Sequence, residues 1–153
     1  MKKSVILTAC MSVLALGSLA TFADGPPSTC SLATLHGTYA YNNIVTTARG
    51  PQATNGLESY DGAGHLKYFQ QYNYGGVTSG TWTGTGTYSF APFTQGGITV
   101  NCIATVIYDG DTSHPWTYAV APDGNFFNYT NLFNMGAVAA GHEDRISRAL
   151  LVQ

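Results

Sequence analysis

The chain has 153 residues, of which 9% are charged, and its formal net charge at pH 7 is −2. This composition argues against nucleic acid and anionic membranes as partners, because both attract basic surfaces. Aromatic residues make up 12% of the chain, which excludes a disordered protein. Because charges are scarce, hydroxyl and amide groups must supply most of the polar surface.

The N-terminus has the three parts of a cleavable signal peptide. Lys2 and Lys3 precede an apolar run, which ends in small residues that suit cleavage after Ala23. The run of about 15 apolar residues is short for a membrane span, and no basic stop-transfer segment follows it. We therefore expect residues 1–23 to be removed and residues 24–153 to form one secreted or periplasmic domain without membrane insertion.

The rest of the chain alternates between polar and apolar residues in the manner of β-strands, with short glycine-rich turns between the segments. In chain order, the expected strands cover residues 36–47, 57–60, 65–74, 80–90, 98–108, 116–120, 126–133 and 137–151. The last of them is either a strand or a strand that ends in a short helix. Short turns throughout favour an all-β antiparallel meander, closed as a barrel of about eight strands, over the alternative of a β-sandwich.

The segment with the clearest alternation lies in the middle of the domain. Its Trp82, Tyr88 and Phe90 share one face with Gly84 and Gly86, and threonines line the other face. Glycines on an aromatic face relieve crowding where a sheet coils, or they leave room for a ligand against the backbone.

The number of cysteines in the mature protein depends on the signal peptide, because its removal takes Cys10 away and leaves Cys30 and Cys102. In an exported protein, two cysteines without a metal-ligand spacing indicate one disulfide. A disulfide between Cys30 and Cys102 closes a long loop, which contributes about 4–5 kcal/mol to the free energy of unfolding in the chain-entropy model. The four histidines are scattered at no ligand spacing, so neither a metal site nor a cofactor is expected.

Short motifs recur along the domain: Cys30 followed by Leu35-x-Gly37-Thr38-Tyr39, Asp61-Gly62-x-Gly64, Gly84-Thr85-Gly86-Thr87-Tyr88, Cys102, Asp123-Gly124-x-x-Phe127, and Gly141 with Arg145. Together they resemble a family of small exported bacterial proteins, most of which have no assigned function. The resemblance implies a small antiparallel barrel of the calycin (lipocalin-like) or allene-oxide-cyclase-like kind. The lipocalin Gly-x-Trp signature is absent, since Tyr39 follows Gly37 and Thr38, and no catalytic residue can be carried over.

Glu58 is the first candidate for acid–base chemistry. In an extended strand it shares a face with Tyr60, while Leu57 and Ser59 lie on the other face. If the Tyr60 face is the barrel interior, burial raises the pKa of Glu58 toward neutrality, which suits a general acid or base. If Leu57 marks the buried side, Glu58 lies in solvent.

A second candidate pair lies near the C-terminus. His142 and Asp144 fall on one face of an extended strand, where they are either an acid–base pair or the polar mouth of a barrel. Glu143 and Arg145 fall on the other face and could pair with each other.

The aromatic residues exceed what the core of a small barrel needs. They are core residues, the walls of a cavity, or exposed platforms for sugars. The expected walls are Tyr68, Tyr72, Trp82, Tyr88, Trp116 and Tyr118.

We accordingly expect a barrel that binds a small, largely apolar molecule in its interior, with Glu58 as polar anchor. The alternatives are a cofactor-free isomerase or cyclase, which would use Glu58 or the pair of His142 and Asp144, and a carbohydrate-binding or adhesive surface module.

Overall fold

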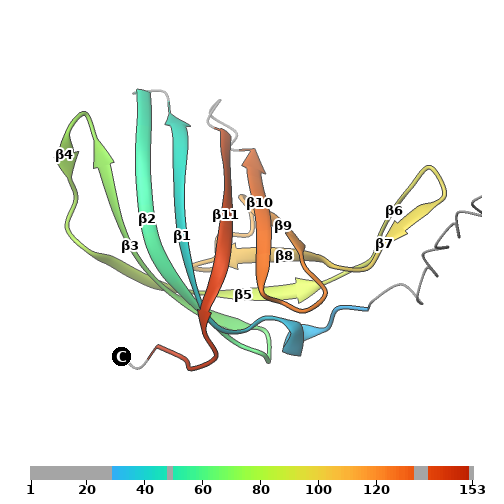
Figure 1. Ribbon diagram of the computed structural model, residues 1–153. Helices are drawn as coiled ribbons and strands as arrows, with labels where there is room; N and C mark the ends of the chain where they lie inside the picture. The colour runs from blue at the N-terminus through green and yellow to red at the C-terminus, as the bar shows by residue number, and fades with distance from the viewer. Residues whose placement is uncertain (1–28, 48–49, 133–137, 152–153) are drawn as a thin grey trace, which may run out of the picture.

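The computed structural model describes residues 29–47, 50–132 and 138–151 (Figure 1). The expected signal peptide and Cys10 lie outside the described residues. Within the described ranges, no helix has the length and apolar character needed to cross a membrane.

The described residues form eleven strands and one short 3-10 helix. The elements are η1 (Leu32–Thr34), β1 (His36–Thr47), β2 (Gly50–Asp61), β3 (His65–Tyr74), β4 (Val77–Thr78), β5 (Trp82–Phe90), β6 (Phe93–Gln95), β7 (Ile98–Val100), β8 (Ile103–Tyr108), β9 (Trp116–Val120), β10 (Phe126–Leu132) and β11 (Val138–Ser147). The all-β prediction is confirmed. Several bounds differ. Strand β2 begins well before residue 57, β5 begins at Trp82, β11 ends at Ser147, and the expected strand 98–108 is divided into β7 and β8. The short strands β4 and β6 were not expected.

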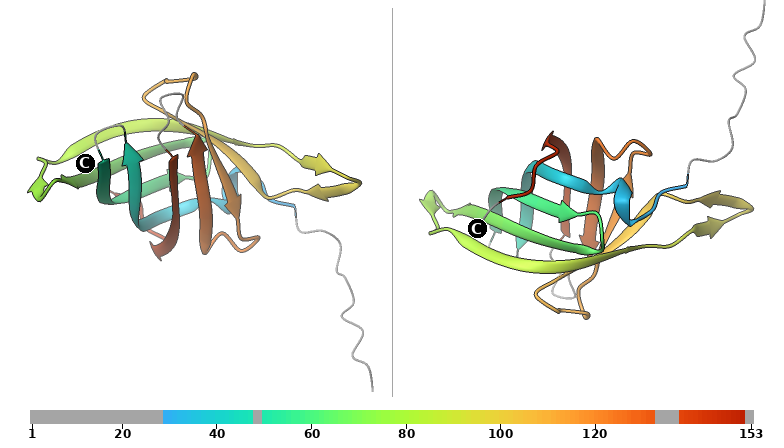
Figure 2. Two further views of the ribbon diagram at one scale, coloured as in Figure 1. Left: turned by 90° about the horizontal axis from the view of Figure 1, so that it is seen from above. Right: turned by 90° about the horizontal axis from the view of Figure 1, so that it is seen from below.

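Eight of the described strands close into an antiparallel barrel, as the meander predicts. Strands β1, β2, β3, β5, β8, β9, β10 and β11 each pair with the next, and β11 pairs back with β1. Figure 1 shows β2, β1, β11 and β10 side by side as one wall, with β5 and β8 crossing at a steep angle. Strand β4 extends the edge of β3, and the β6–β7 hairpin projects away from the barrel in both views of Figure 2.

One end of the barrel is closed by buried side chains and by η1. Tyr88 donates a hydrogen bond from its hydroxyl to the carbonyls of Leu32 and Leu35, both at 2.9 Å. Tyr39 donates in the same way to the carbonyl of Gly124 at 2.6 Å. The core around these contacts consists of Leu35, Tyr39, Tyr60, Leu66, Tyr88, Cys102, Ala104, Val106, Tyr118, Val120, Phe127 and Tyr129.

The disulfide fastens this closed end. Cys30 and Cys102 are bonded, with their Cα atoms 5.0 Å apart, which confirms the predicted bridge. It joins the segment before η1 to the start of β8, so the residues that close the barrel cannot move away from its wall. Such a structural disulfide is typical of proteins in an oxidising, non-cytoplasmic environment.

Several of the short motifs noted in the sequence meet at the closed end. Gly124 has a φ of +65°, and a Cβ there would collide with the carbonyl of Thr34. Arg145 donates hydrogen bonds to the carbonyls of His36 at 3.2 Å and Asp123 at 3.0 Å. These motifs therefore serve to close the barrel.

At the other end, three tyrosine rings lie over glycines of neighbouring strands. In each pair the two residues are direct register partners: Tyr41 with Gly56, Tyr68 with Gly84, and Tyr129 with Gly141. A Cβ at Gly56 would come within 2.7 Å of the Tyr41 ring, and one at Gly84 within 2.5 Å of the Tyr68 hydroxyl. Each ring thus occupies the space that a side chain would fill, so these glycines relieve crowding on the inner face.

This packing predicts the effect of adding one methyl group inside the barrel. We expect Gly56→Ala to lower the free energy of unfolding by about 1–3 kcal/mol, because the Tyr41 ring and the Phe69 carbonyl would have to move. Gly80→Ala is the matched control, since nothing lies within 4 Å of a Cβ at that position. Urea denaturation measures both, and equal stabilities for the two variants would contradict the role of the glycine.

Candidate functional site

A cavity of about 380 Å³ lies at the end of the barrel opposite η1. This volume falls within the roughly 300–1,000 Å³ of small-molecule sites. The lining residues are Tyr41, Asn43, Glu58, Tyr68, Gln70, Tyr108, Asp109, Asp111, His114, Trp116, Tyr118, Tyr129 and Glu143. They come from the inner faces of the barrel strands and from the β8–β9 loop, which forms one side of the mouth.

Glu58 lies inside the barrel, on the same face as Tyr60. This is the inward one of the two orientations that the sequence allowed. It is 3% exposed, and each of its carboxyl oxygens accepts a hydrogen bond from a tyrosine. Tyr108 donates to Oε1 at 2.5 Å, and Tyr60 donates to Oε2. Burial raises the pKa of Glu58 to about 7, although the two hydroxyl donors favour the ionised form. Glu58 therefore changes its protonation near neutral pH.

The tyrosines around Glu58 form one hydrogen-bonded network. The hydroxyls of Tyr108 and Tyr118 are bonded to each other, so Tyr118 extends the network away from Glu58. Burial and the charge of Glu58 raise the pKa values of Tyr60, Tyr108 and Tyr118 well above their ordinary value. These hydroxyls stay protonated at neutral pH and remain hydrogen-bond donors.

Glu143 is a second carboxyl in the same cavity. Its side chain is 1% exposed, and no group in the described part of the chain donates a hydrogen bond to its Oε2. Burial, followed by the charge of Glu58, raises the pKa of Glu143 well above its ordinary value. The charge of one carboxyl therefore opposes the ionisation of the other.

Glu143 and Arg145, which could have paired, do not contact each other through a hydrogen bond or ion pair. The two residues do share a face, but a separation of two residues along a strand is about 7 Å. Arg145 therefore lies at the closed end of the barrel, where it donates hydrogen bonds to backbone carbonyls and to the side chain of Asn125. Glu143 is left in the cavity without a basic partner among the described residues that line it.

The mouth of the cavity carries two further acids, both in the β8–β9 loop. Asp109 adopts a φ of +50° and accepts hydrogen bonds from the Tyr68 hydroxyl at 2.6 Å and the Thr85 amide at 3.1 Å. Asp111 lies 2.7 Å from Nδ1 of His114. Hydrogen bonds from Ser113 and His114 lower the pKa of Asp111 to about 2, so this carboxyl is ionised at neutral pH.

The six predicted wall residues are divided among three places. Tyr68, Trp116 and Tyr118 line the cavity. Tyr88 belongs to the core of the closed end. Tyr72 and Trp82 lie together with ring centroids 6.3 Å apart, and Trp82 is 54% exposed.

The predicted pair of His142 and Asp144 does form, but on the outer face of the barrel. His142 lies between Asp144, 3.1 Å from Nε2, and Asn128, 3.0 Å from Nδ1. All three side chains are exposed. This surface position removes the pair from the cavity and from any chemistry that takes place there.

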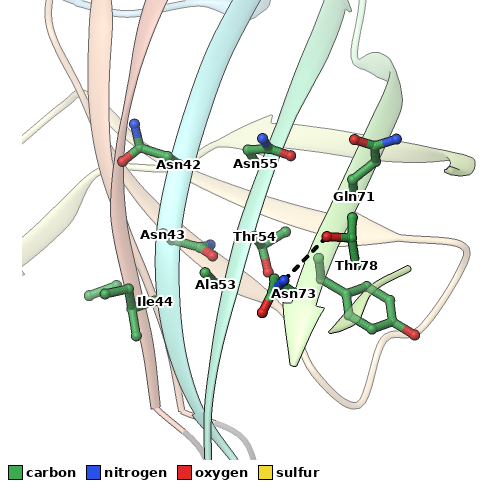
Figure 3. A pocket seen from close by; sticks show the side chains of 11 residues that line it. Asn42, Asn43, Ile44, Ala53, Thr54, Asn55, Gln71, Asn73 and Thr78 are labelled. Carbon is green, nitrogen blue, oxygen red and sulfur yellow. Dashed lines mark hydrogen bonds between the residues drawn. The ribbon is translucent and has the colours of Figure 1, made fainter. Parts of the chain in front are cut away.

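A groove of about 650 Å³ runs over the far halves of β1, β2 and β3 (Figure 3). Asn42, Asn55 and Gln71 form a row across it, because each is the register partner of the next. Asn73 donates a hydrogen bond to the Thr78 hydroxyl at 3.2 Å, drawn as the dashed line in Figure 3. Such amides can bind the hydroxyls of a polar ligand. The full lining is Asn42, Asn43, Ile44, Ala53, Thr54, Asn55, Gln71, Tyr72, Asn73, Thr78 and Ala140.

Several cavity residues have no motif that marks them in the sequence. Tyr41 and Asn43 follow the inward-facing Tyr39 at steps of two, so alternation along β1 was an available signal. Glu143 had a weaker signal, namely its place two residues after Gly141, on the same face of an extended strand. Tyr108, Tyr129 and Gln70 required the register of distant strands.

The buried carboxyls predict a stability that falls as the pH rises. A carboxyl whose pKa increases on folding favours the folded state below its ordinary value of 4.5, and this contribution is lost as the pH passes its folded value of about 7. For Glu58 we expect a loss of about 3 kcal/mol in the free energy of unfolding between pH 5 and 8. Urea denaturation across this range measures it, and a flat profile would contradict the burial of ionisable carboxyls.

Substitution separates the contribution of Glu143. Glu143→Gln is expected to be more stable than the wild type at pH 8 and to lose less stability across the range. Asp144→Asn, an exposed neighbour on the same strand, is the matched control and should keep the full decline.

Comparisons with protein-family models, with curated proteins and with solved structures find no match for this chain. Of the resemblance described above, the small antiparallel barrel is confirmed. The chemistry of the cavity thus rests on the residues that line it.

Proposed function

We propose that this protein is an exported barrel that binds a small molecule in the cavity opposite η1. The observation that carries the proposal is a ligand-sized cavity with two buried carboxyls, Glu58 and Glu143, in its wall. Buried carboxyls reduce the stability of the folded protein, so their presence in a cavity points to a function. Residues 1–23 would direct export and be removed, and the mature protein would be periplasmic or secreted, in keeping with its disulfide.

The lining modifies the kind of ligand expected from the sequence. Trp116 and the tyrosine rings offer an apolar surface, as a largely apolar ligand requires. The same wall carries Asn43, Gln70 and the two carboxyls. The ligand that fits has an apolar body and at least one polar group, because an entirely apolar molecule would leave these groups desolvated and unpaired.

A second candidate is a cofactor-free isomerase or cyclase in the same cavity. The observation that favours it is the pair of carboxyls, since burial raises the pKa of Glu58 to about 7 and that of Glu143 well above its ordinary value. Two carboxyls with separated pKa values supply a base and an acid at one pH. Glu58 would be the base and the protonated Glu143 the acid.

A carbohydrate-binding module is the third candidate, and it would use the groove rather than the cavity. The row formed by Asn42, Asn55 and Gln71 supports it, with Tyr72 at the side of the groove. Loss of sugar binding on Asn55→Ala, with cavity binding unchanged, would assign this function to the groove.

Small-molecule binding is tested with the intrinsic fluorescence of Trp116. Trp82→Phe leaves Trp116 as the one tryptophan of the chain, and Trp116 lines the cavity. We expect saturable millimolar or tighter binding of at least one of three probes of similar shape, namely benzyl alcohol, benzoate and benzylamine. Gln70→Phe should abolish this binding by filling the cavity, whereas Gln71→Phe, on the other face of the same strand, should not. Absence of binding for all three probes would contradict the proposal.

Catalysis is tested with 5-nitrobenzisoxazole, whose ring opens when a base removes the proton on C3. If Glu58 is a catalytic base, the rate should rise with pH through about 7, because the carboxylate form increases. Glu58→Gln should then lose at least tenfold in rate, while Asp144→Asn should not. A rate equal to that of the buffer would exclude Glu58 from this role.

A further inference from the structure

The charges that face the cavity have one sign. Four acids line it, two buried inside and two at the mouth: Glu58, Glu143, Asp109 and Asp111. No lysine or arginine is present among the described residues of the lining, and His114 is paired with Asp111. A cavity lined in this way attracts cations and repels anions, because its walls focus the field of the carboxyls.

Two buried oxygens in the wall accept no hydrogen bond from the described residues. They are Oε2 of Glu143 and Oδ1 of Asn43. Buried acceptors in proteins nearly always have donors. A ligand that brings N–H groups would satisfy Oδ1 of Asn43 and, once Glu143 is ionised, its Oε2, whereas a carboxylate, ether or ketone brings only acceptors and would leave the Asn43 oxygen unpaired.

Aromatic rings adjoin these acceptors on two sides. Tyr41 is the register partner of Glu143, and Tyr129 accepts a hydrogen bond at 2.8 Å from Nδ2 of Asn43. Trp116 packs against Tyr129 with a centroid separation of 5.5 Å. Tryptophan and tyrosine faces attract organic cations through their quadrupoles, and they also cover the apolar part of such a molecule.

We propose that the cavity binds a small organic amine in its protonated form, with the ammonium group between Glu143 and Asn43 and the apolar part against Trp116. This inference rests on the proposed binding function and names its ligand class. The amine must be small, because the cavity has a volume of about 380 Å³.

Binding of a cation should also release a proton from the carboxyl pair. The groups that face Glu58 and Glu143 are neutral tyrosines, namely Tyr41, Tyr60, Tyr108, Tyr118 and Tyr129. The titratable groups at the mouth of the cavity are Asp109, Asp111 and His114. No lysine or arginine lines the described part of the cavity, so no fixed positive charge there neutralises a carboxylate. An ammonium group therefore favours ionisation of the pair, and the proton passes to solvent.

The test compares benzylamine with benzyl alcohol, which have the same shape and differ in charge. At pH 8 we expect the amine to bind about tenfold to a hundredfold more tightly than the alcohol. The preference should shrink as the pH falls to 5, since the carboxyls take up protons while the amine keeps its charge. Calorimetry in two buffers of different protonation enthalpy should show proton release at neutral pH.

Glu143→Gln should lower the affinity for the amine toward that for the alcohol and so remove most of the preference. Asp144→Asn, its exposed neighbour, should keep the preference. The pH series on the wild type gives the same information without any variant.

Each outcome separates the two proposals. Equal affinities for amine and alcohol, or binding of benzoate in preference to benzylamine, would overturn the amine as ligand class and leave small-molecule binding in place. Absence of binding for every probe would overturn both.

Discussion

The open end of this barrel, which is the end opposite η1 that holds the cavity, owes its shape to tyrosine rings that lie over glycines. An eight-stranded barrel is just wide enough for its interior to be filled by side chains. At Gly56, Gly84 and Gly141 the inner face has no side chain, and rings from the neighbouring strands occupy that space. The remaining volume forms the cavity, and the rings that lie against the backbone make part of its wall.

The two ends of the barrel have opposite energetic roles. The closed end has a dense core, bonds from tyrosine hydroxyls to backbone carbonyls, and a disulfide that restricts the unfolded chain. The open end buries two carboxyls that favour the unfolded state above neutral pH. The bridge, worth about 4–5 kcal/mol in the chain-entropy model, is large enough to offset one such carboxyl.

Alternation along the strands predicts the face of a residue but not its height along the barrel axis. Tyr68, Tyr72 and Tyr88 were grouped as one wall, and only Tyr68 lines the cavity. Tyr88 lies at the closed end, and Tyr72 lies toward the far end of β3 beside the groove. Height is set by the register between strands distant in sequence, which no local pattern contains.

The same reasoning explains which parts of the site were predictable. The strands, the meander, the disulfide and the inward option for Glu58 follow from local alternation and cysteine count. Glu143 was assigned a neighbour of opposite charge, as surface strands often show. Its burial depends on the pairing of β11 with both β1 and β10, and that pairing appears only when the barrel closes.

Closure of one end means that a bound molecule enters and leaves by the same path. The β8–β9 loop lies on that path, and Asp109 holds it in place through the Tyr68 hydroxyl and the Thr85 amide. A change in this loop that leaves the cavity intact alters the association and dissociation rates by the same factor. The residence time of a ligand therefore depends on this loop as well as on the cavity, whereas the equilibrium affinity depends on the residues that contact the bound molecule.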